Sequence, residues 1–178
     1  VKNHQEGKTD IALKLYNQVL KIDPNYVHAH NNLSIIFIKL KDFQKAKECF
    51  EKVIAINPNN ADAHNNLGNI FKELEENQKA IDCYEKAITI NPNNAIAHSN
   101  LSVIFKTLKD YQKAIDCVEK AIELNPNYSQ AHNNLGVIFK DLREYEKAKS
   151  CYEKAIDLKP DYADAHNNLG IIFRELGE

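Results

Sequence analysis

The feature that most constrains this chain is a strict 34-residue period. Its five prolines occupy one position of that period, with no insertion or deletion between them: Pro24, Pro58, Pro92, Pro126 and Pro160. A fixed period of about 20 to 50 residues is typical of chains that stack one supersecondary unit on the next, because a single unit cannot bury its apolar face alone. The period therefore predicts a repeat array.

Counting from the prolines divides the chain into full repeats flanked by two partial ones. We predict a single array over residues 1–178. A partial repeat at 1–26 precedes the full repeats, and another at 163–178, which holds only a first helix, follows them. The full repeats are 27–60, 61–94, 95–128 and 129–162.

Each full repeat contains two amphipathic helical patterns. In 61–94 apolar residues recur every three or four positions after Asn60, whose side chain can cap a helix. The second pattern ends at Asn91, because the following Pro92 disfavours a helical residue before it. The link between the two patterns is short, so the helices must be antiparallel. No strand pattern occurs, and we predict an all-α fold.

Small residues recur on both helices of each repeat. Glycine and serine alternate on the first helix and alanine recurs on the second, where a large side chain would hold the helices apart. A glycine inside a helix costs up to about 1 kcal/mol relative to alanine, so we expect close helix approach to compensate. The two series are Ser34, Gly68, Ser102, Gly136 and Gly170, and Ala12, Ala46, Ala80, Ala114 and Ala148.

The composition is that of a folded protein with little net charge. Hydrophobic residues make up 43% and charged residues 27%, with a formal net charge of −2 and a pI near 6.4. These values give no support for nucleic-acid or membrane-surface binding. No apolar run approaches the roughly 20 residues that span a bilayer, and the polar N-terminus has no signal-peptide core. Because the chain also lacks an initiator methionine, we expect a fragment or a processed product.

The four cysteines share the same spacing: Cys49, Cys83, Cys117 and Cys151. Equivalent positions in stacked helices lie about 8–10 Å apart, beyond the roughly 7 Å between Cα atoms that a disulfide tolerates. We therefore expect small buried thiols, and a reducing compartment such as the cytoplasm.

These residues together resemble the tetratricopeptide repeat over essentially the whole chain. The small residue, the aromatic at Phe71, the alanine, the aromatic at Tyr84 and the proline fall where that pattern places them. The resemblance implies a right-handed superhelical solenoid of helix pairs, whose first helices line a concave groove in a non-enzymatic protein–protein interaction scaffold. The family's inter-helix glycine is replaced by a charged residue in every full repeat, at Lys41, Glu75, Lys109 and Arg143.

A doubled asparagine, or Ser99-Asn100 once, precedes the core leucine of each first helix. One residue is about 100° of helix rotation, so the second asparagine leaves the apolar stripe. The resemblance implies that these carboxamides line the groove as a ladder, where their donors and acceptors match a peptide main chain. Alternatively, they bond to the adjacent helix and stiffen the stack, and the two roles can coexist. The candidate peptide contacts are Asn31, Asn32, Asn65, Asn66, Asn69, Asn100, Asn133, Asn134, Asn167 and Asn168.

A row of cations adds four further candidate contacts: Lys72, Lys106, Lys140 and Arg174. They favour acidic peptide residues by electrostatic complementarity, unless they are solvated helix ends paired with local carboxylates. The carboxylate clamp of heat-shock chaperone adaptors in this family uses lysines and an arginine. Asparagines occupy the matching positions here, so clamp-type binding is disfavoured.

Five aligned histidines also raise the question of a metal site: His30, His64, His98, His132 and His166. Metal ligands must converge within about 2.0–2.6 Å of one ion, whereas stacked positions are about 8–10 Å apart. We expect these rings to pack at the repeat junctions, with a pH-sensitive stack as the alternative. No phosphate loop, nucleophile elbow or zinc motif is present, so we predict no catalytic site, no metal and no cofactor.

Three other functions remain open beside peptide binding. The uncovered last helix at 174–178 favours self-association through the terminal repeats. The runs such as Ala63-His64-Asn65-Asn66 look like the repeats of O-linked N-acetylglucosamine transferases, so the segment is alternatively the substrate-docking arm of a larger glycosyltransferase. RNA-reading helical repeats are disfavoured, because no basic groove is evident.

Overall fold

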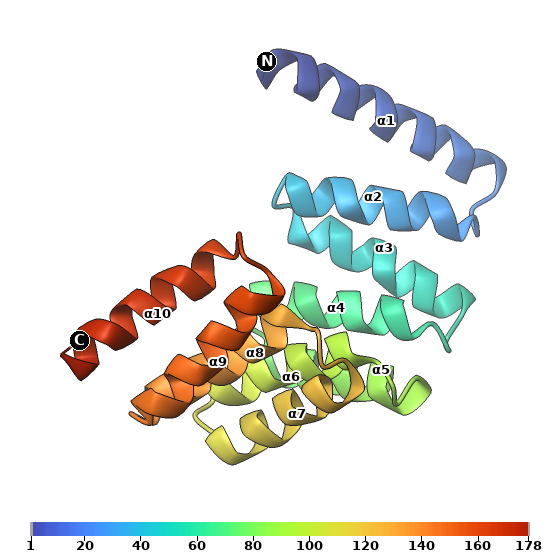
Figure 1. Cartoon of the computed structure of the whole chain (residues 1–178). Helices are drawn as coiled ribbons and strands as arrows, with labels where there is room; N and C mark the ends of the chain where they lie inside the picture. Colours follow the sequence, from blue (N-terminus) through green and yellow to red (C-terminus); the bar gives the residue numbers. More distant parts are fainter. Residues whose placement is uncertain (1, 178) are drawn as a thin grey trace. The chain divides into compact units, whose positions relative to one another are not determined.

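The computed structural model describes the backbone of residues 2–177 and the side chains of residues 8–177. The outermost residues of the two predicted partial repeats, Val1 and Glu178, lie outside the described part. Residues 2–177 form ten α-helices and no strand, which confirms the predicted all-α fold (Figure 1). The helices divide into two compact units after Ile90.

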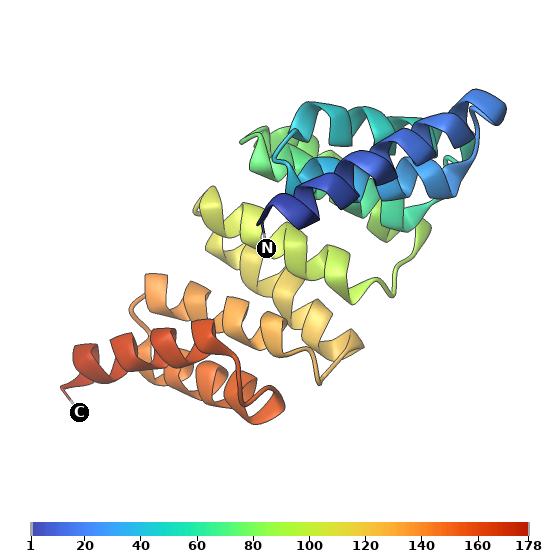
Figure 2. The same cartoon turned by 90° about the horizontal axis from the view of Figure 1, so that it is seen from above.

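The first unit contains five helices in which each packs antiparallel to the next (Figures 1 and 2). The first helices of its repeats are α2 and α4, and the second helices are α1, α3 and α5. Their bounds are α1 Lys2–Ile22, α2 Val27–Lys39, α3 Phe43–Ile56, α4 Ala61–Glu73 and α5 Asn77–Ile90.

The second unit continues the same alternation with first helices α6, α8 and α10 and second helices α7 and α9. Here α8 contacts both α6 and α10, so neighbouring first helices touch directly as well as through the second helices. The bounds are α6 Ala95–Thr107, α7 Tyr111–Leu124, α8 Ser129–Asp141, α9 Tyr145–Leu158 and α10 Ala163–Leu176.

Side-chain caps and left-handed residues mark the helix ends. The side chain of Asn60 accepts a hydrogen bond from the backbone N–H of Ala63 at 3.0 Å, which confirms the predicted cap of α4. The four charged residues that replace the family's inter-helix glycine all have positive φ angles, between 58° and 62°. A side chain in this region costs roughly 1–2 kcal/mol relative to right-handed backbone, which explains why glycine is the usual choice.

The glycines of the first helices make room for a tyrosine of the second. A Cβ atom on Gly68 would lie 2.6 Å from Cε1 of Tyr84, and one on Gly136 would lie 2.6 Å from Cε1 of Tyr152. Both tyrosines are fully buried. The expectation of close helix approach therefore holds at these two positions, where the ring lies directly on the glycine backbone.

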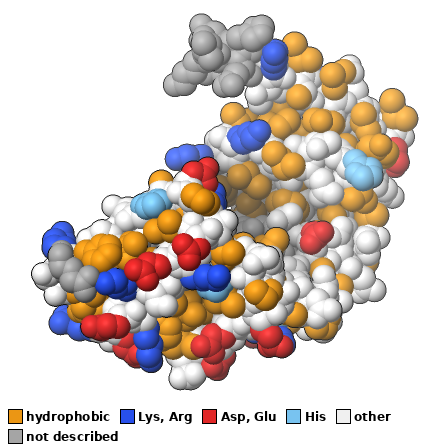
Figure 3. Space-filling model, viewed as in Figure 1, with side chains coloured by type: hydrophobic (Ala, Val, Ile, Leu, Met, Phe, Trp, Pro, Cys, Tyr) orange, Lys and Arg blue, Asp and Glu red, His pale blue; other side chains and the backbone are white. Residues whose placement is uncertain are grey.

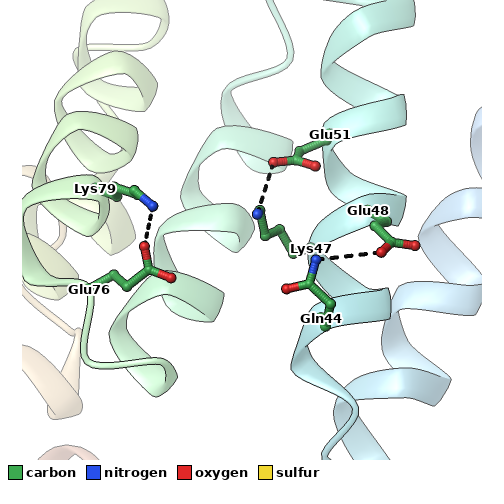
Figure 4. Close-up of polar contacts among 6 residues, drawn as sticks. All are labelled: Gln44, Lys47, Glu48, Glu51, Glu76 and Lys79. Carbon is green, nitrogen blue, oxygen red and sulfur yellow. Dashed lines mark hydrogen bonds and ion pairs between the residues drawn. The ribbon is translucent and has the colours of Figure 1, made fainter.

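The second helices α3 and α5 carry short-range polar pairs near their N-terminal ends. Figure 4 shows three of them: Lys47 with Glu51 at 3.7 Å, Gln44 with Glu48 at 3.5 Å, and Lys79 with Glu76. Pairs three or four residues apart stabilise a helix by about 0.2–0.5 kcal/mol each.

Candidate peptide-binding site

The two asparagines of each pair lie in different environments. The first member of the pair is buried in the central repeats, with 7% of Asn65, none of Ser99 and 6% of Asn133 exposed. The second member is half-buried on every first helix: Asn32, Asn66, Asn100, Asn134 and Asn168. One residue of helix rotation thus separates a polar group inside the stack from one at its surface.

Within the second unit the pairs are joined by hydrogen bonds. Asn134 donates from Nδ2 to Oγ of Ser99 at 3.1 Å, and Asn168 donates from Nδ2 to Oδ1 of Asn133 at 3.1 Å. Each bond links the half-buried asparagine of one first helix to the buried residue of the preceding one. The intramolecular role considered for these asparagines is therefore present in this unit.

These bonds leave binding capacity on the ladder. A carboxamide has two N–H donors and an oxygen acceptor, and each of the two bonds uses a single N–H. The remaining donor and the oxygen of Asn134 and Asn168 have an orientation fixed by the first bond. A fixed amide costs less entropy when it binds a ligand than a freely rotating one.

In the first unit the ladder borders a hollow between α2 and α4. Its volume is about 160 Å³, and its lining includes Asn31, Asn66 and Asp62. Asn69, also a predicted contact, accepts a hydrogen bond on Oδ1 from the hydroxyl of Tyr84 at 2.8 Å. Sequence reasoning missed this bond, although the spacing of 15 residues places the two side chains in facing helices.

The predicted cations lie at the C-terminal ends of the first helices, and several have acidic neighbours. Lys72 contacts Glu73 at 3.2 Å, Lys106 contacts Asp141 at 3.9 Å, and Arg174 contacts Glu175 at 3.4 Å. Over the C-terminal helices, the face seen in Figure 3 shows both charge signs interspersed. Because exposed pairs of this kind are worth about 0–1 kcal/mol, an acidic ligand can compete for these cations.

The histidines take the structural role expected of them at the repeat junctions. In each case Nε2 lies 2.8–3.3 Å from the carbonyl oxygen of the proline six residues earlier, so the ring nitrogen donates to that oxygen. Burial is the main cause that lowers the pKa of His98, and nearby Lys120 acts in the same direction. Among residues 8–177 no three metal-ligating side chains cluster closely enough to hold an ion.

The cysteines offer little reactivity. Burial raises the pKa of the thiol to about 11 in Cys49, Cys83 and Cys151, which keeps each of them protonated at neutral pH. Among the described residues no disulfide joins the cysteines.

In the part of the chain that the structure covers, none of the helices combines the length and the apolar character that crossing a membrane requires.

The repeat geometry and the sequence agree with one protein family. A family model described as tetratricopeptide repeat matches residues 61–94, 95–128 and 129–162, and two further models with the same description match 4–70 and 151–178. The chain belongs to the tetratricopeptide repeat family. It is a helical-repeat scaffold of the protein-binding class.

Individual proteins extend this comparison. The crystal structure of MamA is 27% identical, covers 91% of this chain and 95% of its own, and superposes with a TM-score of 0.75. The first repeat domain of Spaghetti (RPAP3), bound to the HSP90 peptide SRMEEVD, is 29% identical over 66% of this chain and 94% of its own, with a TM-score of 0.63. The uncharacterized protein ycf37 of Pyropia yezoensis is 43% identical over 47 residues, which span 26% of each protein. None of these comparisons tests the resemblance to transferase repeats, which stays a prediction.

Proposed function

We propose that the chain is a non-enzymatic scaffold that binds an extended peptide through the ladder of half-buried asparagines on its first helices. The observation that carries this proposal is the pair of bonds from Asn134 and Asn168 to the preceding repeat. They align the carboxamides and leave an N–H and an oxygen on each for the ligand. Rungs about 10 Å apart match about three residues of extended chain.

A peptide ligand is consistent with the chemistry of a relative. The repeat domain of Spaghetti (RPAP3), which is 29% identical, is bound to a peptide rich in glutamate. In the chain described here the ligand is held by amides, with Lys72, Lys106, Lys140 and Arg174 as cations at the edge. The buried Asn133 accepts the bond from Asn168 and positions the ladder, and the equally buried Asn65 is placed behind the ladder rather than at its surface.

Replacing Asn66, Asn100 and Asn134 together with alanine tests this function. A matched control replaces Asn59, Asn93 and Asn127, which are exposed loop residues, with alanine. We expect the ladder variant to lose at least about tenfold in affinity for peptides captured by the wild-type chain, since each lost hydrogen bond is worth about 0.5–1.5 kcal/mol. The control should bind like the wild type. Equal affinity of the two variants, with unchanged helicity by circular dichroism, would contradict the proposal.

A second candidate function is self-association, and one packing feature favours it. Gly170 on α10 occupies the position of Gly68 and Gly136, yet no heavy atom lies within 4 Å of a Cβ built on it. Tyr16 on α1 occupies the position of Tyr84 and Tyr152 in the repeat. A second copy can therefore place its Tyr16 against Gly170, as the internal pairs do.

Sedimentation of residues 1–178 tests this contact. We expect the mean mass to rise with concentration, and Gly170→Leu to lower it by blocking the space for the ring. Gly68→Leu is not a useful control because it disturbs the internal packing, whereas Ile96→Leu on an exposed site of α6 leaves both surfaces unchanged. A monomer at all concentrations would refute self-association without affecting the peptide-binding proposal.

A further inference from the structure

A small hollow lies between the first helices α6 and α8 of the second unit. Its volume is about 110 Å³, and its lining comes from three residues of each helix: Ser102, Val103, Lys106, Asn134, Val137 and Ile138. The hollow therefore contains one rung of the proposed ladder and one of the predicted cations. It also contains three apolar side chains, which no role considered so far explains.

The lining combines three apolar side chains with three polar ones. Ser102 and Ile138 are buried, and the hydroxyl of Ser102 already donates to the carbonyl oxygen of Ser99 at 2.7 Å. Val103 and Val137 are half-buried and form the apolar sides. Asn134 is held by its bond to the preceding repeat, and Lys106 has only a loose contact with Asp141 at 3.9 Å.

The same positions in the first unit carry a different chemistry. Two repeats earlier, Ile38 stands in the place of Lys106, and Asn69 stands in the place of Val137. Asn69 fills its position with a carboxamide that bonds to Tyr84. The hydroxyl of Tyr152, the counterpart of Tyr84, is buried without a hydrogen-bond partner among the described residues. Val137 thus gives this position an apolar side chain and leaves the buried hydroxyl of Tyr152 unpaired among the described residues.

We propose that this hollow is the specificity pocket of the peptide site and that it selects a short branched aliphatic side chain next to an acidic residue. The proposal rests on the peptide-binding function above. A cavity of about 150 Å³ holds a benzene molecule, so the smaller hollow here matches the isopropyl group of valine better than an indole ring. Asn134 bonds to the peptide main chain beside this residue, and Lys106 attracts the carboxylate next to it.

The test uses four fluorescein-labelled hexapeptides with serine and threonine flanks and amidated ends. Their central pairs are Val-Glu, Gly-Glu, Trp-Glu and Val-Lys, and binding is measured by fluorescence anisotropy. A missing aliphatic group in an apolar pocket costs about 10- to 200-fold, so Val-Glu should bind at least tenfold more tightly than Gly-Glu. We expect Trp-Glu to bind no better than Gly-Glu. Val-Lys should bind about fivefold more weakly than Val-Glu, as expected for a surface ion pair.

Two variants exchange chemistry between the repeats of this same chain. Val137→Asn places a carboxamide where Asn69 stands in the first unit and offers Tyr152 the partner that Tyr84 has, so the fold is retained. We expect it to remove the preference for Val-Glu over Gly-Glu. Lys106→Ile copies Ile38 and should remove only the preference for Val-Glu over Val-Lys. The matched control, Ile38→Lys in the first unit, should leave the valine-to-glycine ratio unchanged.

The outcomes separate this inference from the peptide-binding function. If Val137→Asn keeps the tenfold preference for Val-Glu over Gly-Glu, the pocket does not select the side chain and the inference is wrong. If all four peptides bind the wild type equally but the ladder variant loses them, the inference fails and the ladder stands. If none of the four binds the wild type, the inference is wrong, whereas the peptide-binding function is decided by the ladder variant and its control.

Discussion

Two tyrosines at equivalent positions differ in a single hydrogen bond, and this difference predicts opposite effects of the same substitution. The hydroxyl of Tyr84 donates to Oδ1 of Asn69 at 2.8 Å, whereas the buried hydroxyl of Tyr152 has no partner among the described residues, because valine stands at position 137. Both rings are fully buried against a glycine, so the replacement by phenylalanine keeps the packing of both.

The magnitudes follow from the hydrogen-bond balance. Tyr84→Phe removes a made bond and should lower the free energy of unfolding by about 0.5–1.5 kcal/mol, toward the lower value because the half-exposed Asn69 can bond to water. Tyr152→Phe removes an unpaired buried hydroxyl, whose desolvation costs about 1–3 kcal/mol, so it should raise the free energy of unfolding by up to that amount. The two variants thus differ in the sign of the effect.

Urea unfolding of both variants, followed by circular dichroism at 222 nm, measures this difference. In a chain that already carries Val137→Asn, Tyr152→Phe should instead lower the free energy of unfolding as Tyr84→Phe does, because it removes the bond between the new carboxamide and the hydroxyl. Equal destabilisation by Tyr84→Phe and Tyr152→Phe would refute the reasoning, since it would mean that the hydroxyl of Tyr152 is as well paired as that of Tyr84.

Three further predictions concern the helix packing, the helix ends and pH. Gly68→Ala should lower the unfolding free energy by about 1–3 kcal/mol, because the new methyl group overpacks against the ring of Tyr84. Gly170→Ala meets no neighbour within 4 Å and should raise the unfolding free energy by up to about 1 kcal/mol. Thermal melts compare the two variants, and equal effects would argue against the role of the tyrosine ring. Arg143→Gly should stabilise by about 1 kcal/mol because the φ angle of 62° is unfavourable for a side chain; a lower urea midpoint would contradict this. Burial lowers the pKa of His98 below its ordinary value of 6.5, so the unfolded chain binds the proton more readily and stability is lost as the pH falls from above 6.5 through the lowered pKa. Between pH 8 and pH 5 the unfolding midpoint should therefore fall less in His98→Asn than in the wild type, and an identical fall would refute the assignment.

The fold was predictable because a 34-residue period indicates a stacked array of helix pairs. Proline and alanine recur without a gap, glycine or serine stands at the small position of each first helix, and each has a local reason to stand where it does. The cap at Asn60 was also predictable, since capping depends on a residue and its next three neighbours. These features need no knowledge of which helices meet in space.

The details of the site depend on contacts between repeats, so they were harder to predict from the sequence. Periodicity shows that Asn133 and Asn134 point in different directions, but only the packing of α6, α8 and α10 reveals that one is buried and the other donates to a neighbouring helix. Similarly, valine stands at position 137 where asparagine stands at the equivalent position 69. Nothing in the sequence around Val137 signals that the hydroxyl of Tyr152 is therefore left without a partner among the described residues. Whether the asparagines contact a ligand stays a prediction.

The side-chain amide resonances of the ladder provide the most direct test of peptide binding by asparagine. In a ¹⁵N-labelled chain titrated with the Val-Glu hexapeptide, we expect the Nδ2 signals of Asn134 and Asn168 to shift in a saturable way. Signals from Asn59 and Asn93, which lie in loops, should stay in place. If the peptide binds and the ladder signals do not move, the ligand is held elsewhere and the asparagine ladder serves only to join the repeats.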